Sequence, residues 1–149
     1  MPLRIPKTPT YDLTKKRSSL PIYTGETVDP KSKMTVLEIE GNGYLDGLNL
    51  EWHNVSHENL KLWITIDGEQ TYIYGSWFAG ALGFIDDPPV NTNSKPWTIC
   101  RWDTTNNWYS ISFTSPLFFS EKIKIEIENT NDTNSLNFGL GTMVVKVRD

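Results

Sequence analysis

The chain has 149 residues, of which 38% are hydrophobic, 12% aromatic and 21% charged, and its formal net charge is −4 at pH 7. This length fits one domain, and the composition is that of a globular protein. The single cysteine excludes an intramolecular disulfide, and no apolar run reaches the roughly 18 residues of a membrane-spanning helix.

Residues 1–34 differ from the rest of the chain in charge and in proline content. They hold seven Lys and Arg against three acids, a net charge of +4, whereas residues 35–149 hold seven bases against fifteen acids, a net charge of −8. They also hold five of the nine prolines, which restrict the backbone to extended conformations. We therefore predict a basic, extended N-terminal arm over residues 1–34 and a folded domain over residues 35–149.

The folded domain shows the alternation typical of short β-strands. Isoleucine alternates with Lys or Glu over residues 122–128, which puts all the isoleucines on one face of a strand. In chain order, the candidate strands are residues 35–40, 45–52, 60–67, 97–102, 108–113, 122–128 and 138–148. Turn sequences such as Asp67-Gly68 separate them, and Cys100 is expected to be buried in its strand. No long helical period is present, so we predict an all-β antiparallel sandwich, in particular a jelly roll, with a Greek-key barrel as the alternative.

Residues 75–84, with the sequence GSWFAGALGF, are uncharged and rich in small and aromatic side chains. A short buried helix or an apolar loop would explain them. A contact between subunits would also explain them, because exposed apolar patches often mark interfaces. We predict that Trp77 and Phe78 supply buried contact in such an interface.

The basic residues of the arm are predicted to complete the interface. An arm of +4 beside a domain of −8 suits docking on the acidic surface of a neighbouring subunit, whereas that domain would repel a nucleic acid, so nucleic acid is not an expected partner. The interface residues predicted in the arm are Arg4, Lys7, Lys15, Lys16 and Arg17.

Six tryptophans are a high number for a chain of 149 residues. Such rings fill a core, bury themselves in a protein interface or stack on sugar rings. The candidate ligand-binding residues are Trp97, Trp102, Trp108 and Tyr109.

No catalytic residue and no metal site is predicted. His53 and His57 lie four apart, but in a polar connection between strands, and only the adjacent Glu58 could join them as a ligand. No spacing selects a carboxylate pair for glycoside hydrolysis, and neither a serine nucleophile elbow nor a phosphate-binding glycine loop is present. We therefore expect a protein that is not an enzyme and needs no cofactor.

The segment GNGYLDGL at residues 41–48, followed by LKLWITIDG at residues 60–68, resembles a pattern common in phage and archaeal-virus structural proteins. In those proteins a glycine-led strand and a strand ending in Asp-Gly open a sandwich behind an extended basic arm. The resemblance implies self-assembly or attachment to a capsid or tail, without cofactor or catalysis.

The sequence thus favours a structural subunit of a virion. Its expected partners are copies of itself and other virion proteins, and without a secretory signal it would be made in the cytoplasm. The alternative is a carbohydrate- or receptor-binding sandwich.

Overall fold

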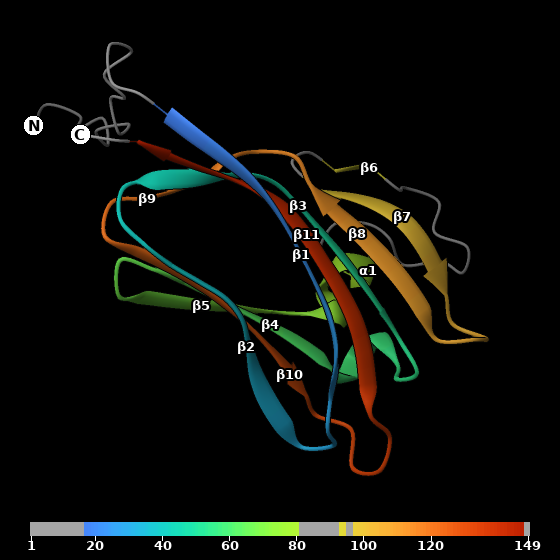
Figure 1. Cartoon of the computed structure of the whole chain (residues 1–149). Helices are drawn as coiled ribbons and strands as arrows, with labels where there is room; N and C mark the ends of the chain where they lie inside the picture. The colour runs from blue at the N-terminus through green and yellow to red at the C-terminus, as the bar shows by residue number, and fades with distance from the viewer. Residues whose placement is uncertain (1–16, 81–92, 95–96, 148–149) are drawn as a thin grey trace, which may run out of the picture.

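The structure is a computed structural model, and it describes residues 17–80, 93–94 and 97–147. Two antiparallel sheets pack face to face around an apolar core (Figure 1). In the described residues the helices are α1 (Gly75–Gly80) and the 3-10 helix η1 (His57–Asn59). Neither has the length and apolar character that crossing a membrane would require.

The larger sheet has seven strands and runs in the order β1-β11-β3-β8-β7-β6. Its seventh strand, β9, pairs with β3 beyond the stretch of β3 that pairs with β8. In chain order these strands are β1 (Arg17–Val28), β3 (Gly43–His53), β6 (Asn93–Ser94), β7 (Trp97–Asp103), β8 (Trp108–Phe113), β9 (Leu117–Phe119) and β11 (Leu136–Val147).

The smaller sheet has four strands in the order β2-β10-β4-β5. In chain order they are β2 (Ser32–Glu40), β4 (Leu60–Ile66), β5 (Glu69–Tyr74) and β10 (Lys122–Asn129). β2 and β5 are therefore its two edges.

The strand pairs are nested along the chain. β1 pairs with β11, β2 with β10, β3 with β8 and β9, and β4 with β5, and these pairs fall alternately in the larger and the smaller sheet. The innermost pair is a hairpin closed by Asp67-Gly68, whose φ angles of 50° and 87° are both positive, as the type I′ turn favoured in two-residue hairpins requires.

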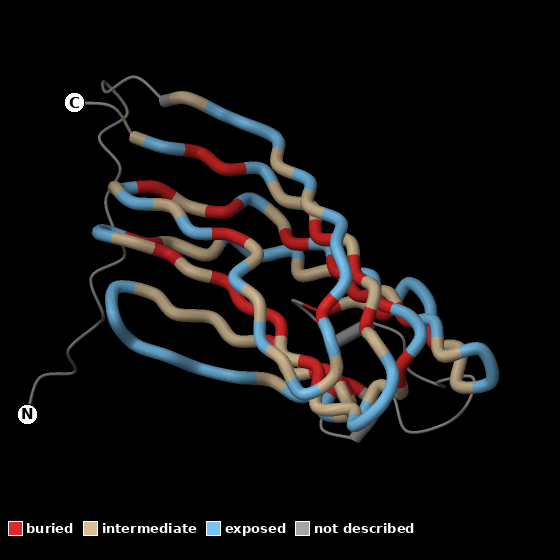
Figure 2. The backbone as a smooth tube through the Cα atoms, turned by 60° about the horizontal axis from the view of Figure 1, so that its bottom comes forward, coloured by how far each residue is buried: buried red, intermediate tan, exposed pale blue. Residues whose placement is uncertain are grey.

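Alternation along the strands builds the core between the sheets (Figure 2). Ile123, Ile125 and Ile127 of β10 are completely buried, and each contributes roughly 1.5–3 kcal/mol through the apolar surface it removes from water. Glu126, between Ile125 and Ile127, is nearly buried on the outer face of β10 beside Lys33 and Lys124, with each Nζ 3.7 Å from Glu126 Oε1.

Residues 17–34 belong to the folded domain, which corrects the boundary predicted at residue 34. β1 pairs with β11 along all twelve of its residues, and β2 begins at Ser32. Pro21 is tolerated because β1 is an edge strand, where a missing N–H can face away from the sheet. Pro30 lies in the turn between β1 and β2. Residues 1–16 lie outside the described residues.

Phe78 and Cys100 differ from their expected positions. Phe78 of α1 is completely buried, and its ring centroid lies 4.8 Å from that of Trp97. It therefore belongs to this chain's own core and does not reach a neighbouring subunit. Cys100 is exposed because it alternates with the buried Trp97 and Ile99 of β7, and the register shift between Ile99 and Arg101 leaves it without a partner residue on β8.

Deleting residues 1–34 should abolish cooperative unfolding, because it removes β1 and leaves one side of β11 unpaired. Deleting residues 1–16 should move the melting midpoint by only a few degrees. Circular dichroism melts of both fragments and the full chain measure the difference. A fragment of residues 35–149 that melts as cooperatively as the full chain would contradict the structural role of β1.

Candidate interaction surface at the β5 edge

β5 is the least protected edge strand among the described strands. Natural sheets guard their edges with lysine, proline, bulges or very short strands, because an open edge can pair with another chain. β1 carries Pro21, β2 carries Lys33, and β6 has only two residues. β5 has the sequence EQTYIY, with one charge and no proline, and its register with β4 is unbroken.

An apolar groove follows this edge. One part is a hollow of about 560 Å³, lined by Ile64, Ile66, Asp67, Glu69, Thr71 and Leu117. The next part is a hollow of about 580 Å³, lined by Thr71, Tyr72, Ile73, Tyr74 and Trp77. Thr71 lines both parts, so they adjoin along β5, and we call the whole surface the β5 groove.

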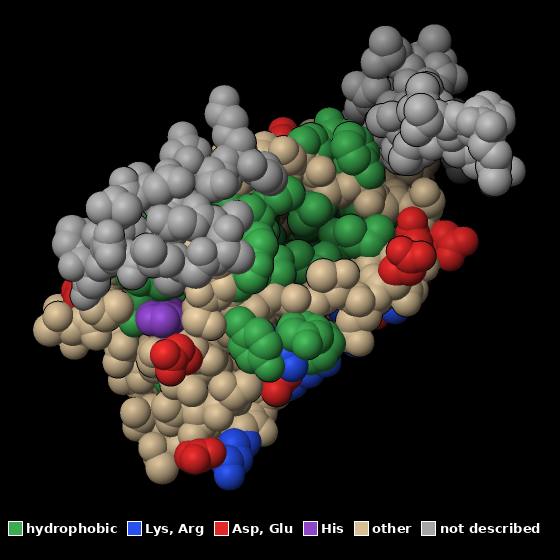
Figure 3. Space-filling view, turned by 180° about the vertical axis from the view of Figure 1, so that it is seen from behind, with side chains coloured by type: hydrophobic (Ala, Val, Ile, Leu, Met, Phe, Trp, Pro, Cys, Tyr) green, Lys and Arg blue, Asp and Glu red, His purple; other side chains and the backbone are tan. Residues whose placement is uncertain are grey.

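The β5 groove forms where the two sheets cover each other incompletely. Ile64 and Ile66 are on the inner face of β4 but remain partly exposed, and Leu117 of β9 faces them from the other sheet. Figure 3 shows apolar side chains gathered around a hollow on this side of the molecule, with charged side chains at its border. The groove is thus a continuation of the core that reaches solvent.

The aromatic side chains on the outer side of β5 form a connected row. The ring centroid of Tyr72 lies 4.9 Å from that of Trp63 and 5.6 Å from that of Tyr74. The Lys61 ammonium lies 4.1 Å from the Tyr72 ring centroid, and the Lys33 ammonium 4.0 Å from that of Trp63. These lysines cover ring faces that a sugar would need for stacking, so the row is better suited to a protein contact.

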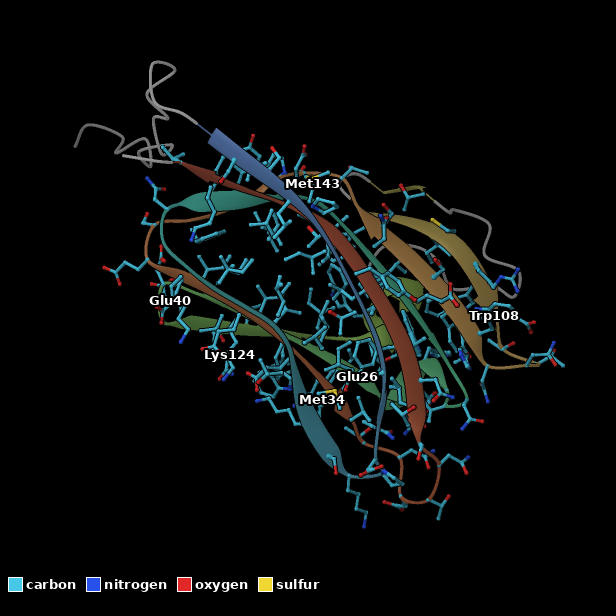
Figure 4. All side chains as sticks on the ribbon, in the orientation of Figure 1. Glu26, Met34, Glu40, Trp108, Lys124 and Met143 are labelled. Atoms are coloured by element: carbon cyan, nitrogen blue, oxygen red, sulfur yellow. The ribbon has the colours of Figure 1, made fainter. Side chains whose placement is uncertain are left out.

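Oppositely charged side chains form a network on the outer face of the other strands of the smaller sheet, β2, β10 and β4. Lys122 pairs with Glu38, which lowers the pKa of Glu38 and raises that of Lys122 through a hydrogen bond and the attraction of the charges. Lys124 and Glu40 lie on β10 and β2 within this region (Figure 4). Charges on this face are largely paired with one another, which distinguishes it from the apolar β5 groove.

Asp67 fixes one end of the β5 groove. Its carboxylate accepts backbone N–H hydrogen bonds from Ser120, Glu121 and Lys122, with nitrogen–oxygen distances between 2.7 and 3.2 Å. Burial pushes the pKa of Asp67 upward, but the N–H donors outweigh it, and the pKa is lowered below its usual value. The hairpin tip is therefore tied to the connection between β9 and β10.

The structure brings together only part of the predicted interface. Trp77 lies in the β5 groove with 40% of its surface exposed, next to Tyr72 and Tyr74, which were not among the predicted interface residues. The alternation of Tyr72 and Tyr74 after the Asp67-Gly68 turn is the sequence feature that could have identified them as exposed residues of a strand. Arg17 begins β1, whereas the other predicted basic residues, Arg4, Lys7, Lys15 and Lys16, lie outside the described residues.

The four candidate ligand-binding aromatics do not form one platform. Trp97, Trp102 and Tyr109 are buried in the core, where the ring centroids of Trp102 and Tyr109 lie 4.8 Å apart. Only Trp108 is exposed, at 39%, and Figure 4 shows it on β8, well away from Glu40 and Lys124. The Arg101 guanidinium lies 3.9 Å from its ring centroid.

The two histidines have separate surroundings. His53 is exposed at the end of β3, next to Trp108 and a small hollow of about 190 Å³. His57 packs instead against Trp102 and Tyr109, with ring centroids 5.0 and 5.5 Å away. Within the described ranges, no three His, Cys, Asp or Glu side chains are grouped so that they could hold a metal ion.

Protein-family models and curated proteins were both compared with the sequence, and neither comparison gives a match. Function is therefore inferred from the surface itself.

Replacing Asp67 with Asn should destabilise the protein by about 1 kcal/mol at pH 7, a value kept small because the carboxylate is largely exposed. Asn tolerates the φ of 50° at this position, so the change removes charge without backbone strain. Because the folded pKa is lowered from 3.8, the stabilisation is fully present above that value and is lost as the pH falls through the lower folded pKa.

Urea unfolding of both proteins between pH 7 and pH 2 measures this difference. The two stabilities should converge at the acidic end. A gap that stays constant over the whole range would show that the Asp67 charge does not hold the hairpin.

Proposed function

We propose that this protein is a non-enzymatic structural subunit of a virion, which assembles with copies of itself through a jelly-roll domain. The observation that carries the proposal is the β5 groove: an unprotected strand edge beside apolar surface, with Tyr72 49% exposed and Trp77 40% exposed. Apolar surface of this kind next to an open edge favours burial against another protein chain.

The nested strand pairs support the jelly-roll part of the proposal. A jelly roll has eight antiparallel strands in two sheets. Here β1-β11-β3-β8 faces β2-β10-β4-β5, with β9 extending the position of β8 along β3, while β7 and β6 widen the larger sheet. Jelly rolls occur in both capsid proteins and lectins, so the surface has to distinguish between the two functions.

The character of the β5 groove favours a macromolecular partner over a small ligand. Small-ligand sites combine a concave apolar pocket with a few polar groups that point at the ligand. At this groove the carboxylate of Asp67 is engaged by backbone N–H groups, so Glu69 is the charged side chain of the lining that remains for a partner, and the groove extends along an open edge. A long extended surface suits a protein segment.

Charge favours association between copies as well. Residues 1–16 contain four bases and one acid, a net charge of +3, and residues 17–149 contain ten bases and seventeen acids, a net charge of −7. Opposite charges on the two parts steer one copy toward another. The predicted interface residues Arg4, Lys7, Lys15 and Lys16 all belong to the basic part, and other virion proteins with an acidic surface would attract it in the same way.

The full chain should form multimers whose mass rises with concentration and falls at high salt. Replacing Tyr72 with Thr and Trp77 with Ser should weaken association by about tenfold or more, because these side chains supply exposed apolar contact at the edge. Light scattering after size exclusion, at low and high salt, measures the mass.

Trp108→Ser is the matched control, since Trp108 and Trp77 are equally exposed, at 39% and 40%, but Trp108 lies on β8 of the larger sheet and Trp77 on α1 beside the β5 groove. It should leave the association unchanged. Both variants need melting curves close to that of the parent chain. A chain that remains monomeric at millimolar concentration, alone and with other virion proteins, would contradict the proposal.

The alternative, a carbohydrate-binding module, is favoured by one observation. Trp108 is 39% exposed beside a hollow lined by His53, Asn54 and Asn106, an arrangement of aromatic and amide groups that suits a sugar, although the Arg101 guanidinium lies over its ring. On this alternative, a glycan array should give binding that Trp108→Ala removes and Trp77→Ala leaves intact. An array without signal would leave assembly as the function.

A further inference from the structure

We propose that the occupant of the β5 groove is a segment of a second copy, residues 10–15, which adds an antiparallel strand to β5. This inference rests on the proposed self-assembly and names its partner surface. Two properties of β5 allow an additional strand to pair with it. In the described structure its outer backbone edge is unpaired, and its side chains alternate between the groove and the outer face of the sheet.

The side chains of β5 alternate between two faces, and this determines which side chains a partner strand needs on each of its own faces. Glu69, Thr71 and Ile73 pair with the inner-face residues of β4 and therefore face the groove. Gln70, Tyr72 and Tyr74 point to the outer face of the sheet, where the two tyrosines border the second hollow of the groove and the Lys61 ammonium lies over both of their rings. A matching strand needs apolar residues on its inner face, a cation opposite Glu69 and an acidic or polar residue near Lys61.

Residues 10–16, with the sequence TYDLTKK, supply this pattern. The segment follows the last proline of the first sixteen residues, Pro9, so each of its residues has the backbone N–H that a ladder requires. At a period of two, Tyr11, Leu13 and Lys15 share one face, and Asp12 and Thr14 share the other.

One antiparallel register satisfies all of these requirements. It places Leu13 opposite Thr71, so that Tyr11 is opposite Ile73 and Lys15 is opposite Glu69. Tyr11 and Leu13 then cover the apolar hollow in front of Ile64 and Leu117, which is the surface the two sheets leave open. On the outer face, Asp12 falls opposite Tyr72, where the Lys61 ammonium is 4.1 Å from the ring centroid.

The competing registers fail on burial and charge. A slip of one residue exchanges the two faces of a strand, which would put Asp12 into the apolar groove and both apolar residues into solvent. A parallel strand centred on the same pair would place Lys15 opposite Ile73 and Tyr11 opposite Glu69. The antiparallel register is therefore selected by the side chains.

The added strand has to come from another copy. Lys15 precedes Arg17, the first residue of β1, by two positions, and two residues span at most about 7 Å. β1 lies over β2, at the edge of the fold opposite β5. The three strand spacings from β2 to β5, at about 4.8 Å each, amount to roughly 14 Å, so Lys15 cannot reach Glu69 of its own chain in this register.

A charge exchange in the full-length protein tests the register. Lys15→Glu alone and Glu69→Lys alone should each weaken association by about 3- to 10-fold, because each puts like charges opposite one another across the strand pair. The two changes together should restore association to near the parent value. Sedimentation equilibrium at constant salt measures the dissociation constants.

Lys16→Glu is the matched control, because it changes the net charge by the same amount on the other face of the strand. It should weaken association less than Lys15→Glu, and Glu69→Lys should not restore it. Multimers that respond equally to both lysine changes, with no restoration by Glu69→Lys, would overturn the proposed occupant while leaving self-assembly in place.

A disulfide trap tests contact between copies directly. In a Cys100→Ser background, one preparation carries Leu13→Cys and the other Thr71→Cys, since directly opposed residues of an antiparallel pair come within disulfide distance. Mixing the two under mild oxidation should give a cross-linked heterodimer, and Leu13→Cys with Gln70→Cys should give much less.

The possible failures of the trap are distinguishable. Multimers without the residue 13–71 cross-link would overturn the occupant alone. A protein that stays monomeric in every preparation would overturn both the occupant and the self-assembly on which it rests.

Discussion

Each sheet of this protein is apolar on one face, so the fold depends on the two inner faces covering each other. Nested antiparallel pairing achieves this over most of their area, because successive pairs fall in alternate sheets. Coverage is incomplete along β5, where Ile64 and Ile66 remain partly exposed. The same arrangement that buries the isoleucines of β10 therefore also produces the open apolar edge from which the proposed assembly follows.

Strands with one face buried in the core could be predicted from sequence, whereas the edge strands β1 and β5 could not. The isoleucine alternation before Asn129 identifies β10 because both of its neighbours and the opposite sheet fix its inner face. The positive charge and the five prolines of residues 1–34 indicate an extended arm, but β1 forms within that range because an edge strand tolerates Pro21. β5 was missed because its inner residues, Glu69, Thr71 and Ile73, are mostly polar at the margin of the core. Alternation also identifies faces without pairing partners, so the nesting became visible only in three dimensions.

Of the residues that form the candidate surface, the sequence predicted only Trp77. Trp77 was selected because uncharged aromatic sequence suggests contact, but the same reasoning selected Phe78, which the chain buries against its own Trp97. Burial of an aromatic ring depends on which strand lies opposite, and local sequence does not contain that information. Tyr72 gains its importance from lying on an unprotected edge beside the groove, a property of the sheet rather than of the residue.

If another copy of this chain covers β5, hydrogen exchange of the β5 backbone amides will depend on protein concentration. Those amides that point away from β4 should exchange rapidly in dilute protein and become protected as the concentration passes the dissociation constant, because a new strand then accepts their hydrogen bonds. The amides of β2, at the other edge of the same sheet, provide the internal reference and should not change. Multimers in which the β5 amides exchange as fast as in the dilute protein would show that no second copy pairs with β5.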